Sequence, residues 1–178
     1  MLFCRIVIKN QNVDEILNHL NVRLKSEYDF YDLIYVNKLG KSITDDTLKI
    51  RVYNHNEWDT KDVLVIRKTA VLIDGAKEDK VLLKEEFDDV ESAKKFVAEN
   101  FSYEFEYAFR LSKTGKEYIS DEFTIWVEDI QNFGLSLEIG ATNQEVLNNV
   151  MNQFEVSERL EKSIPEIMYE EIIKDNQF

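Results

Sequence analysis

The sequence is poor in cysteine, proline, glycine and histidine, and two of these shortages exclude whole classes of site. Its one cysteine, Cys4, cannot form a disulfide within the chain, which favours a reducing compartment and so a cytoplasmic location. The chain has only two histidines, and together with its single cysteine they are too few to build a histidine-based zinc site. Any bound metal must therefore be held by carboxylates, which suit Mg²⁺, Mn²⁺ or Ca²⁺.

Positive charge and long apolar runs are also scarce. The formal net charge is -13, from 22 Lys and Arg against 35 Asp and Glu. Such a surface repels nucleic acids and anionic lipids, so we expect neither as a partner. No stretch approaches the ~20 apolar residues that span a bilayer, and Arg5 interrupts the apolar run that a signal peptide would need. An anion site must therefore be a local concentration of cations.

The composition is that of a folded chain. Apolar residues make up 44% of 178 residues and aromatic residues 12%, which predicts one domain over residues 1–178. Helical spacing of apolar residues predicts helices in residues 12–24, 89–97, 142–154 and 165–174, with caps at Asp89 and Thr142. Between them, alternating runs with turns at Gly75 and Gly115 predict antiparallel strands, and hence an α+β fold.

Each predicted strand has one apolar face and one face with charges of both signs. In residues 47–53, for example, Leu48, Ile50 and Val52 alternate with Lys49 and Arg51. Two interpretations stay open. The charged face lies in water with the apolar face under helices, or the sheet closes into a barrel whose charged face lines a tunnel.

The order of several motifs resembles that of the CYTH superfamily, the triphosphate tunnel enzymes that include class IV adenylate cyclases and thiamine triphosphatases. The matching segments are "LKIR" (48–51), "VLVIRK" (63–68), "LLKEEFDDVESAKKFV" (82–97), "EYAFRLSKTGKEY" (106–118), "FTIWVEDIQNFGLSLEIGA" (123–141) and "EIMYEEII" (166–173). The resemblance spans nearly the whole chain. It implies an antiparallel closed β-barrel of about eight strands, the tunnel, with helices packed outside.

The resemblance also implies site residues. Cations from separate segments would bind a triphosphate: Lys9, Lys49, Arg51, Arg67, Lys84, Arg110 and Arg5, the last in a position where the family has a glutamate. On residues 63–68 the parity of the strand favours Arg67, with Lys68 as the alternative. Glu86, Glu128 and Glu138 would hold Mg²⁺ or Mn²⁺. No catalytic residue is assigned.

The chain departs from the family pattern mainly in "RIVIK" (5–9). Arg5 and Val7 stand where the family has two metal-binding glutamates, and only Lys9 is kept; Ala108 and Gly140 replace a basic and an acidic residue. A guanidinium at position 5 could supply a fixed positive charge in place of a cation and bind phosphate oxygens, but it could not activate water as a metal does. The alternative is that drift has erased the catalytic function.

These features predict a protein that binds a triphosphate, inorganic or organic, and hydrolyses it as a metal-dependent triphosphatase. Adenylate cyclase activity is implied by the family only. The alternatives are a non-catalytic polyphosphate- or nucleotide-binding protein and an interaction module that binds no phosphate. A homodimer is one of the open oligomeric states.

Overall fold

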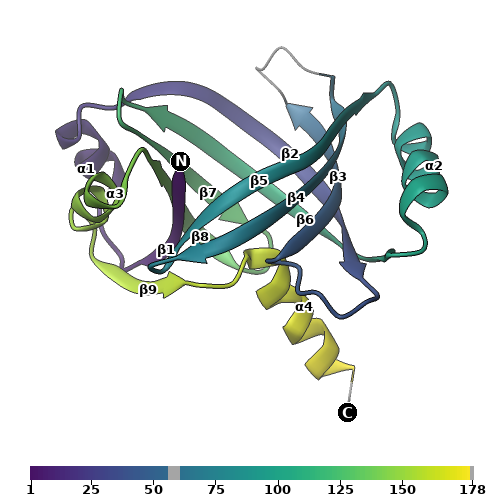
Figure 1. Ribbon diagram of the computed structural model, residues 1–178. Helices are drawn as coiled ribbons and strands as arrows, with labels where there is room; N and C mark the ends of the chain where they lie inside the picture. The colour runs from purple at the N-terminus through teal and green to yellow at the C-terminus, as the bar shows by residue number, and fades with distance from the viewer. Residues whose placement is uncertain (56–60, 177–178) are drawn as a thin grey trace. The chain divides into compact units, whose positions relative to one another are not determined.

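The computed structural model describes residues 1–55 and 61–176 and confirms the α+β class (Figure 1). The elements are β1 (Leu2–Ile8), α1 (Val13–His19), β2 (Arg23–Asn37), β3 (Asp46–His55), β4 (Val63–Ile73), β5 (Ala76–Phe87), α2 (Val90–Phe101), β6 (Phe105–Ile119), β7 (Phe123–Ile130), β8 (Gly134–Ala141), α3 (Gln144–Met151), β9 (Val156–Leu160) and α4 (Ile164–Asp175).

The strands form a mostly antiparallel sheet whose pairings close into a ring. Within the described residues the hydrogen-bonded order is β5-β4-β3-β2-β6-β7-β8-β1-β9. A further pairing joins β5 to β1, with Phe3 opposite Lys77. This confirms the predicted closed antiparallel sheet of about eight strands; the ninth is the short β9, which pairs with β1.

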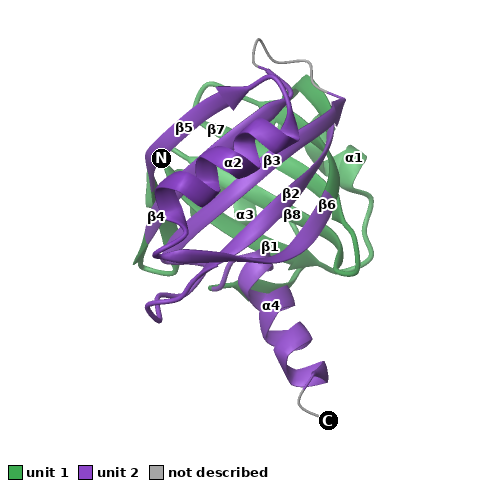
Figure 2. Cartoon of the chain, turned by 90° about the vertical axis from the view of Figure 1, so that its right-hand side faces the viewer, with its two compact units in different colours: residues 1–28, 71–79, 113–161 green, residues 29–70, 80–112, 162–178 purple. Residues whose placement is uncertain are grey.

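The chain divides into two compact units (Figure 2). Unit 1 comprises Met1–Tyr28, Val71–Asp79 and Lys113–Glu161, and unit 2 comprises Asp29–Ala70, Lys80–Ser112 and Lys162–Phe178. The single domain over residues 1–178 stays a prediction.

In unit 1, α1 and α3 cover one face of the sheet. Leu17 of α1 and Leu147 of α3 belong to one core cluster with Ile6, Ile125 and Ile139 of the strands. These apolar residues alternate with polar ones along each strand, so the opposite face of the same strands is polar.

The ends of two unit 1 helices differ from the sequence-based expectation. The first helix stops at His19, and Asn21 adopts a left-handed φ of 52° before β2 begins at Arg23. The cap of α3 is Asn143, whose side chain accepts a hydrogen bond from the Val146 N–H at 3.0 Å. The predicted cap at Thr142 was therefore one residue early.

In unit 2, α2 covers the apolar side of β2, β3 and β4. Ala93 and Val97 of α2 pack in a core cluster with Leu33, Ile50 and Val65. The predicted cap of this helix is confirmed, because an oxygen of Asp89 accepts a hydrogen bond from the Ser92 N–H at 2.7 Å. The last helix, α4, begins with Pro165 in its first turn, as predicted.

The two predicted glycine turns have different outcomes. Gly75 has a φ of 75° in the turn between β4 and β5, as expected for a hairpin glycine. Gly115 lies inside β6, so its predicted turn was wrong. Among the described residues, no helix combines the length and the apolar character needed to cross a membrane.

Candidate functional site

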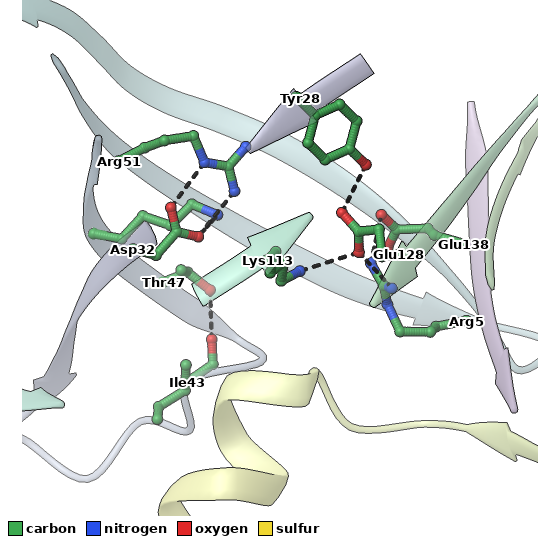
Figure 3. A network of polar contacts seen from close by, with 10 residues as sticks. Arg5, Tyr28, Asp32, Ile43, Thr47, Arg51, Lys113, Glu128 and Glu138 are labelled. Atoms are coloured by element: carbon green, nitrogen blue, oxygen red, sulfur yellow. Dashed lines mark hydrogen bonds and ion pairs between the residues drawn. The ribbon is translucent and has the colours of Figure 1, made fainter. Parts of the chain in front are cut away.

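The polar face of unit 1 brings one arginine and two glutamates together. Cys4 and Ile6 pack in the core beneath the helices, so Arg5, which lies between them in β1, points to the other face. Arg5 lies opposite Glu138 of β8, and Glu128 comes from β7, which pairs with β8 (Figure 3).

The Arg5 guanidinium joins the two carboxylates. Its Nη1 lies 2.7 Å from Oε2 of Glu128 and 2.9 Å from Oγ of Ser136, and its Nη2 lies 3.0 Å from Oε2 of Glu138. Arg5 is 7% exposed and Glu128 5%, whereas the Glu138 side chain is 35% exposed. Removing one partner of a buried ion pair leaves the other charge buried without compensation, which destabilises the fold strongly. The burial of Arg5 as a cation therefore depends on Glu128, and the reverse.

Two more groups contact Glu128. The Tyr28 hydroxyl donates to Oε1 at 2.9 Å, and Nζ of Lys113 donates to Oε2 at 3.2 Å (Figure 3). With Arg5 and Lys113 against Glu128 and Glu138, the cluster carries two positive and two negative charges and is neutral. We call these residues, with Tyr28 and Ser136, the Arg5 cluster.

The position of Tyr28 explains the glycine within β6. A Cβ on Gly115 would lie 2.5 Å from Cζ of Tyr28, closer than real contacts allow. Only glycine therefore lets the Tyr28 ring lie this close to the strand while its hydroxyl reaches Glu128. An isolated glycine inside an alternating run is a sequence signal for such a close approach, and it was misinterpreted as a turn.

Burial and charge set the protonation states of the Arg5 cluster. Burial alone would raise the pKa of Glu128, but the charges of Lys113 and Arg5 and the Tyr28 hydrogen bond hold it well below its usual range. Burial lowers the pKa of Arg5, and the two glutamates more than reverse that effect. Burial and the Glu128 charge raise the pKa of Tyr28 well above its usual range. At neutral pH the pair is ionised and the phenol is protonated.

This arrangement does not fit the divalent metal that the family resemblance implies. The carboxylates of Glu128 and Glu138 both face the Arg5 guanidinium, and the second oxygen of Glu128 accepts from Tyr28. Over residues 1–55 and 61–176, no three His, Cys, Asp or Glu side chains are grouped so that they could hold a metal ion. Glu86 belongs to unit 2, where it is exposed on β5.

Apolar side chains fill the space beside Gly140, where the family pattern has a last glutamate. A Cβ here would lie 2.8 Å from Sδ of Met1, 3.0 Å from Phe3 and 3.1 Å from Trp126. The Phe3 and Trp126 rings are 6.0 Å apart. Trp126 thus has a packing role, and position 140 offers no room for a metal-binding side chain without rearrangement.

In unit 2, Asp32 of β2 binds two of the predicted cations. Its Oδ1 lies 2.8 Å from Nε of Arg51, and its Oδ2 lies 2.9 Å from Nη2 of Arg51 and 3.0 Å from Nζ of Lys49 (Figure 3). Asp32 is 1% exposed, and the guanidinium also lies 3.7 Å from the centre of the Phe30 ring. Burial lowers the pKa of Arg51, but Asp32 raises it overall, so Arg51 stays charged.

The register of β3 and β4 corrects the choice between Arg67 and Lys68. Arg67 lies opposite Leu48, on the side that α2 covers, whereas Lys68 lies opposite Thr47. Residues opposite each other in a sheet share a face. Lys68 therefore lies on the face of Lys49, and parity counted from the sequence pointed to the wrong neighbour because it does not fix the register.

Lys84 lies on the same polar face of unit 2. Leu83 and Phe87 of β5 pack against the core beneath α2, so Lys84 and Glu86, which alternate with them, point away from it. The polar face thus includes the cations Lys49, Arg51, Lys68 and Lys84 and the carboxylates of Asp32 and Glu86, a net charge of +2 over these six residues. We call the four cations the cationic face.

The structure does not bring Arg67 to the cationic face. Its Nη2 lies 3.1 Å from Oδ2 of Asp46 and 2.8 Å from Oε2 of Glu104, and its guanidinium lies 4.9 Å from the centre of the Phe105 ring. Hydrogen bonds to Asp46, opposed by partial burial, raise the pKa of Arg67. Two carboxylates neutralise this arginine, and the ring of Phe101, the last residue of α2, has its centre 5.6 Å from the guanidinium.

Arg110 also lies on the side of the sheet that α2 covers. Its guanidinium is 3.7 Å from the centre of the Tyr31 ring, and Tyr31 packs against the core beneath that helix. Tyr107 contacts the same side through Tyr35, with ring centres 5.9 Å apart. Tyr107 and Arg110 are three residues apart, so strict alternation would put them on opposite faces. The ring contacts of both residues on the side of α2 are not what the parity interpretation predicts.

Lys9, the last of the predicted cations, is exposed just beyond the end of β1 in unit 1. Its backbone N–H donates to the carbonyl of Glu155 at 2.9 Å. Of the seven predicted cations, the structure therefore groups Lys49, Arg51 and Lys84 on one face of unit 2. Arg5 lies in the unit 1 cluster.

Comparisons with known proteins give a result at the level of fold. No family model and no curated protein matches the chain. Solved structures do. The PH1819 protein of Pyrococcus horikoshii OT3 has a TM-score of 0.69 at 15% identity, over 98% of this chain and 99% of that one. The PH1012 protein of the same organism has a TM-score of 0.72 at 14% identity, over 94% and 98%.

A third similar structure is that of HpAC1 from Hippeastrum, an adenylyl cyclase candidate reported to have a dominant triphosphatase activity. Its TM-score is 0.58 at 15% identity, over 85% of each chain. The chain shares the fold of these proteins. At such identities the likeness concerns the fold alone.

Proposed function

We propose that the chain binds a small polyphosphate on the cationic face of unit 2, with an inorganic or organic triphosphate as the first candidate. The observation that carries this proposal is the local charge. Lys49, Arg51, Lys68 and Lys84 share one face with Asp32 and Glu86, a net charge of +2 over these six residues in a chain of net charge -13. A local concentration of cations is what an anion site in an acidic protein requires.

The contacts around Asp32 prepare two of these cations for a phosphate. Asp32 is one carboxylate shared by Lys49 and Arg51, so this buried trio keeps a net charge of +1. Arg51 is fixed by its two hydrogen bonds to Asp32 and by the Phe30 ring, which lowers the ordering cost of binding. Charge-assisted hydrogen bonds from guanidinium and ammonium groups are the strongest contacts that a phosphate finds in proteins.

A matched pair of substitutions tests the site. Lys68→Met removes a charge from the cationic face, and Lys95→Met removes the same charge from α2 in unit 2, where the Lys95 side chain is 76% exposed. One charge-assisted contact is worth about 1.5 kcal/mol, so we expect Lys68→Met to weaken tripolyphosphate binding about tenfold in calorimetric titration. Lys95→Met should bind as the parent does. Equal losses in both variants would mean unspecific attraction and would refute the site.

Hydrolysis of the bound triphosphate is a second candidate, favoured by the triphosphatase activity reported for the Hippeastrum protein. Cations around the phosphates would stabilise charge on the leaving oxygens while water attacks the terminal phosphorus. Phosphate release that Arg51→Ala abolishes would support it. No release with Mg²⁺ or Mn²⁺ would leave binding as the function.

Binding without turnover agrees better with the Arg5 cluster, whose carboxylates do not fit a metal. A cytoplasmic location and a single domain over residues 1–178 belong to the same proposal. Cyclase activity has no residue of its own here, and a folded protein that binds no polyphosphate would be an interaction module.

A further inference from the structure

We infer that the Arg5 guanidinium takes the place of a divalent cation between Glu128 and Glu138, so that this pair of carboxylates binds no metal in the native chain. The geometry is the first reason. Both Oε2 atoms lie within 3.0 Å of nitrogen atoms of one guanidinium, so the two carboxylates converge on the same small volume. A volume bounded by two carboxylates and a hydroxyl would otherwise suit Mg²⁺ or Mn²⁺.

Charge is the second reason. Arg5 and Lys113 balance Glu128 and Glu138, so the cluster has no net negative charge with which to attract a divalent cation. A metal would have to displace a guanidinium that is 7% exposed and has three oxygen partners. Arginine stays protonated at every accessible pH, so its charge is permanent, whereas a metal would come and go with its concentration.

A reversal of charge at position 5 tests the inference. Arg5→Glu would place a third carboxylate beside Glu128 and Glu138, leaving Lys113 as the cluster's one cation and a net charge of -2. We expect this variant to bind Mn²⁺ at least tenfold more tightly than the parent, measured by the loss of the paramagnetic resonance signal of free Mn²⁺. Because Mn²⁺ would bind the folded state, the melting temperature of Arg5→Glu should rise by about 5 °C at a hundredfold excess over its Kd.

The controls separate the site from general attraction to an acidic chain. Adding Glu138→Gln to Arg5→Glu should abolish most of the gain, whereas adding Glu122→Gln, on an exposed residue before β7, should leave it unchanged. Arg5→Ala is the second test variant, with a smaller gain expected because its cluster keeps two carboxylates against Lys113.

Two results would overturn the inference. One is binding of Mn²⁺ to the native chain within threefold of its affinity for Arg5→Glu, with loss of that binding in Glu138→Gln. The other is a folded Arg5→Glu or Arg5→Ala protein that gains no Mn²⁺ affinity. If neither variant folds, Mn²⁺ titrations of the native chain and of Glu138→Gln still test the inference. Mn²⁺ binding by the native chain that Glu138→Gln removes would overturn it. All of these measurements are made without phosphate, so their outcome is independent of the proposed polyphosphate site.

Discussion

Replacing Gly115 by alanine should destabilise unit 1 far more than a methyl group in a strand normally does. The added Cβ would lie 2.5 Å from Cζ of Tyr28, so the ring must move, and its hydroxyl would leave Glu128. Forcing a methyl group into a packed site costs about 1–3 kcal/mol. A lost hydrogen bond to a charged group costs about 1.5–3 kcal/mol. We therefore expect a loss of about 3 kcal/mol in the free energy of unfolding.

Urea denaturation measures this loss, and two comparisons make it specific. Gly140→Ala is the matched control, because its closest neighbour is the flexible end of Met1, and it should cost about 1 kcal/mol. In a Tyr28→Ala background, Gly115→Ala should cost less than about 1 kcal/mol, since the obstructing ring is gone. If Gly115→Ala costs the same with and without the Tyr28 ring, the explanation of this glycine is wrong.

Two further predictions concern the buried carboxylates. The pKa of Glu128 is depressed in the folded chain, so the stability it contributes is present above the ordinary carboxyl pKa of 4.5 and is lost as the pH falls toward the folded-state pKa. The difference in the free energy of unfolding between the native chain and Glu128→Gln should therefore become smaller in acid. A constant difference from pH 7 to pH 3 would contradict this. Asp32→Asn should lower the free energy of unfolding by about 3 kcal/mol in urea denaturation, because it leaves the charges of Lys49 and Arg51 without this carboxylate. Asp88→Asn, at an exposed ion pair, is the control and should lower it by less than about 0.5 kcal/mol.

Local features were readable from the sequence because neighbouring residues determine them. The cap at Asp89 and the turn at Gly75 follow from side chains and backbone within a few residues. The alternation in β3, with Leu48 and Ile50 in the core and Lys49 and Arg51 opposite, follows from the period of a strand.

Features that depend on strand register or on contacts between distant segments could not be predicted from the sequence. Lys68 shares the face of Lys49 because of the β3–β4 register, and Arg110 leaves that face because its guanidinium lies against the Tyr31 ring. The partners of Arg5 lie more than 120 residues away in the sequence, at Glu128 and Glu138. The motif order marked these three positions as site residues. It did not show that they form ion pairs, because pairing between residues so far apart in the sequence depends on the fold.

The most direct test of the central claim is a calorimetric titration of the native chain with inorganic tripolyphosphate in EDTA. We expect saturable binding with a stoichiometry of one. Its affinity should stay within about threefold when Mg²⁺ replaces EDTA, a difference of about 0.7 kcal/mol in the free energy of binding. Binding that requires Mg²⁺ would contradict the metal-free site, and no binding in either buffer would contradict a triphosphate as the ligand of the cationic face.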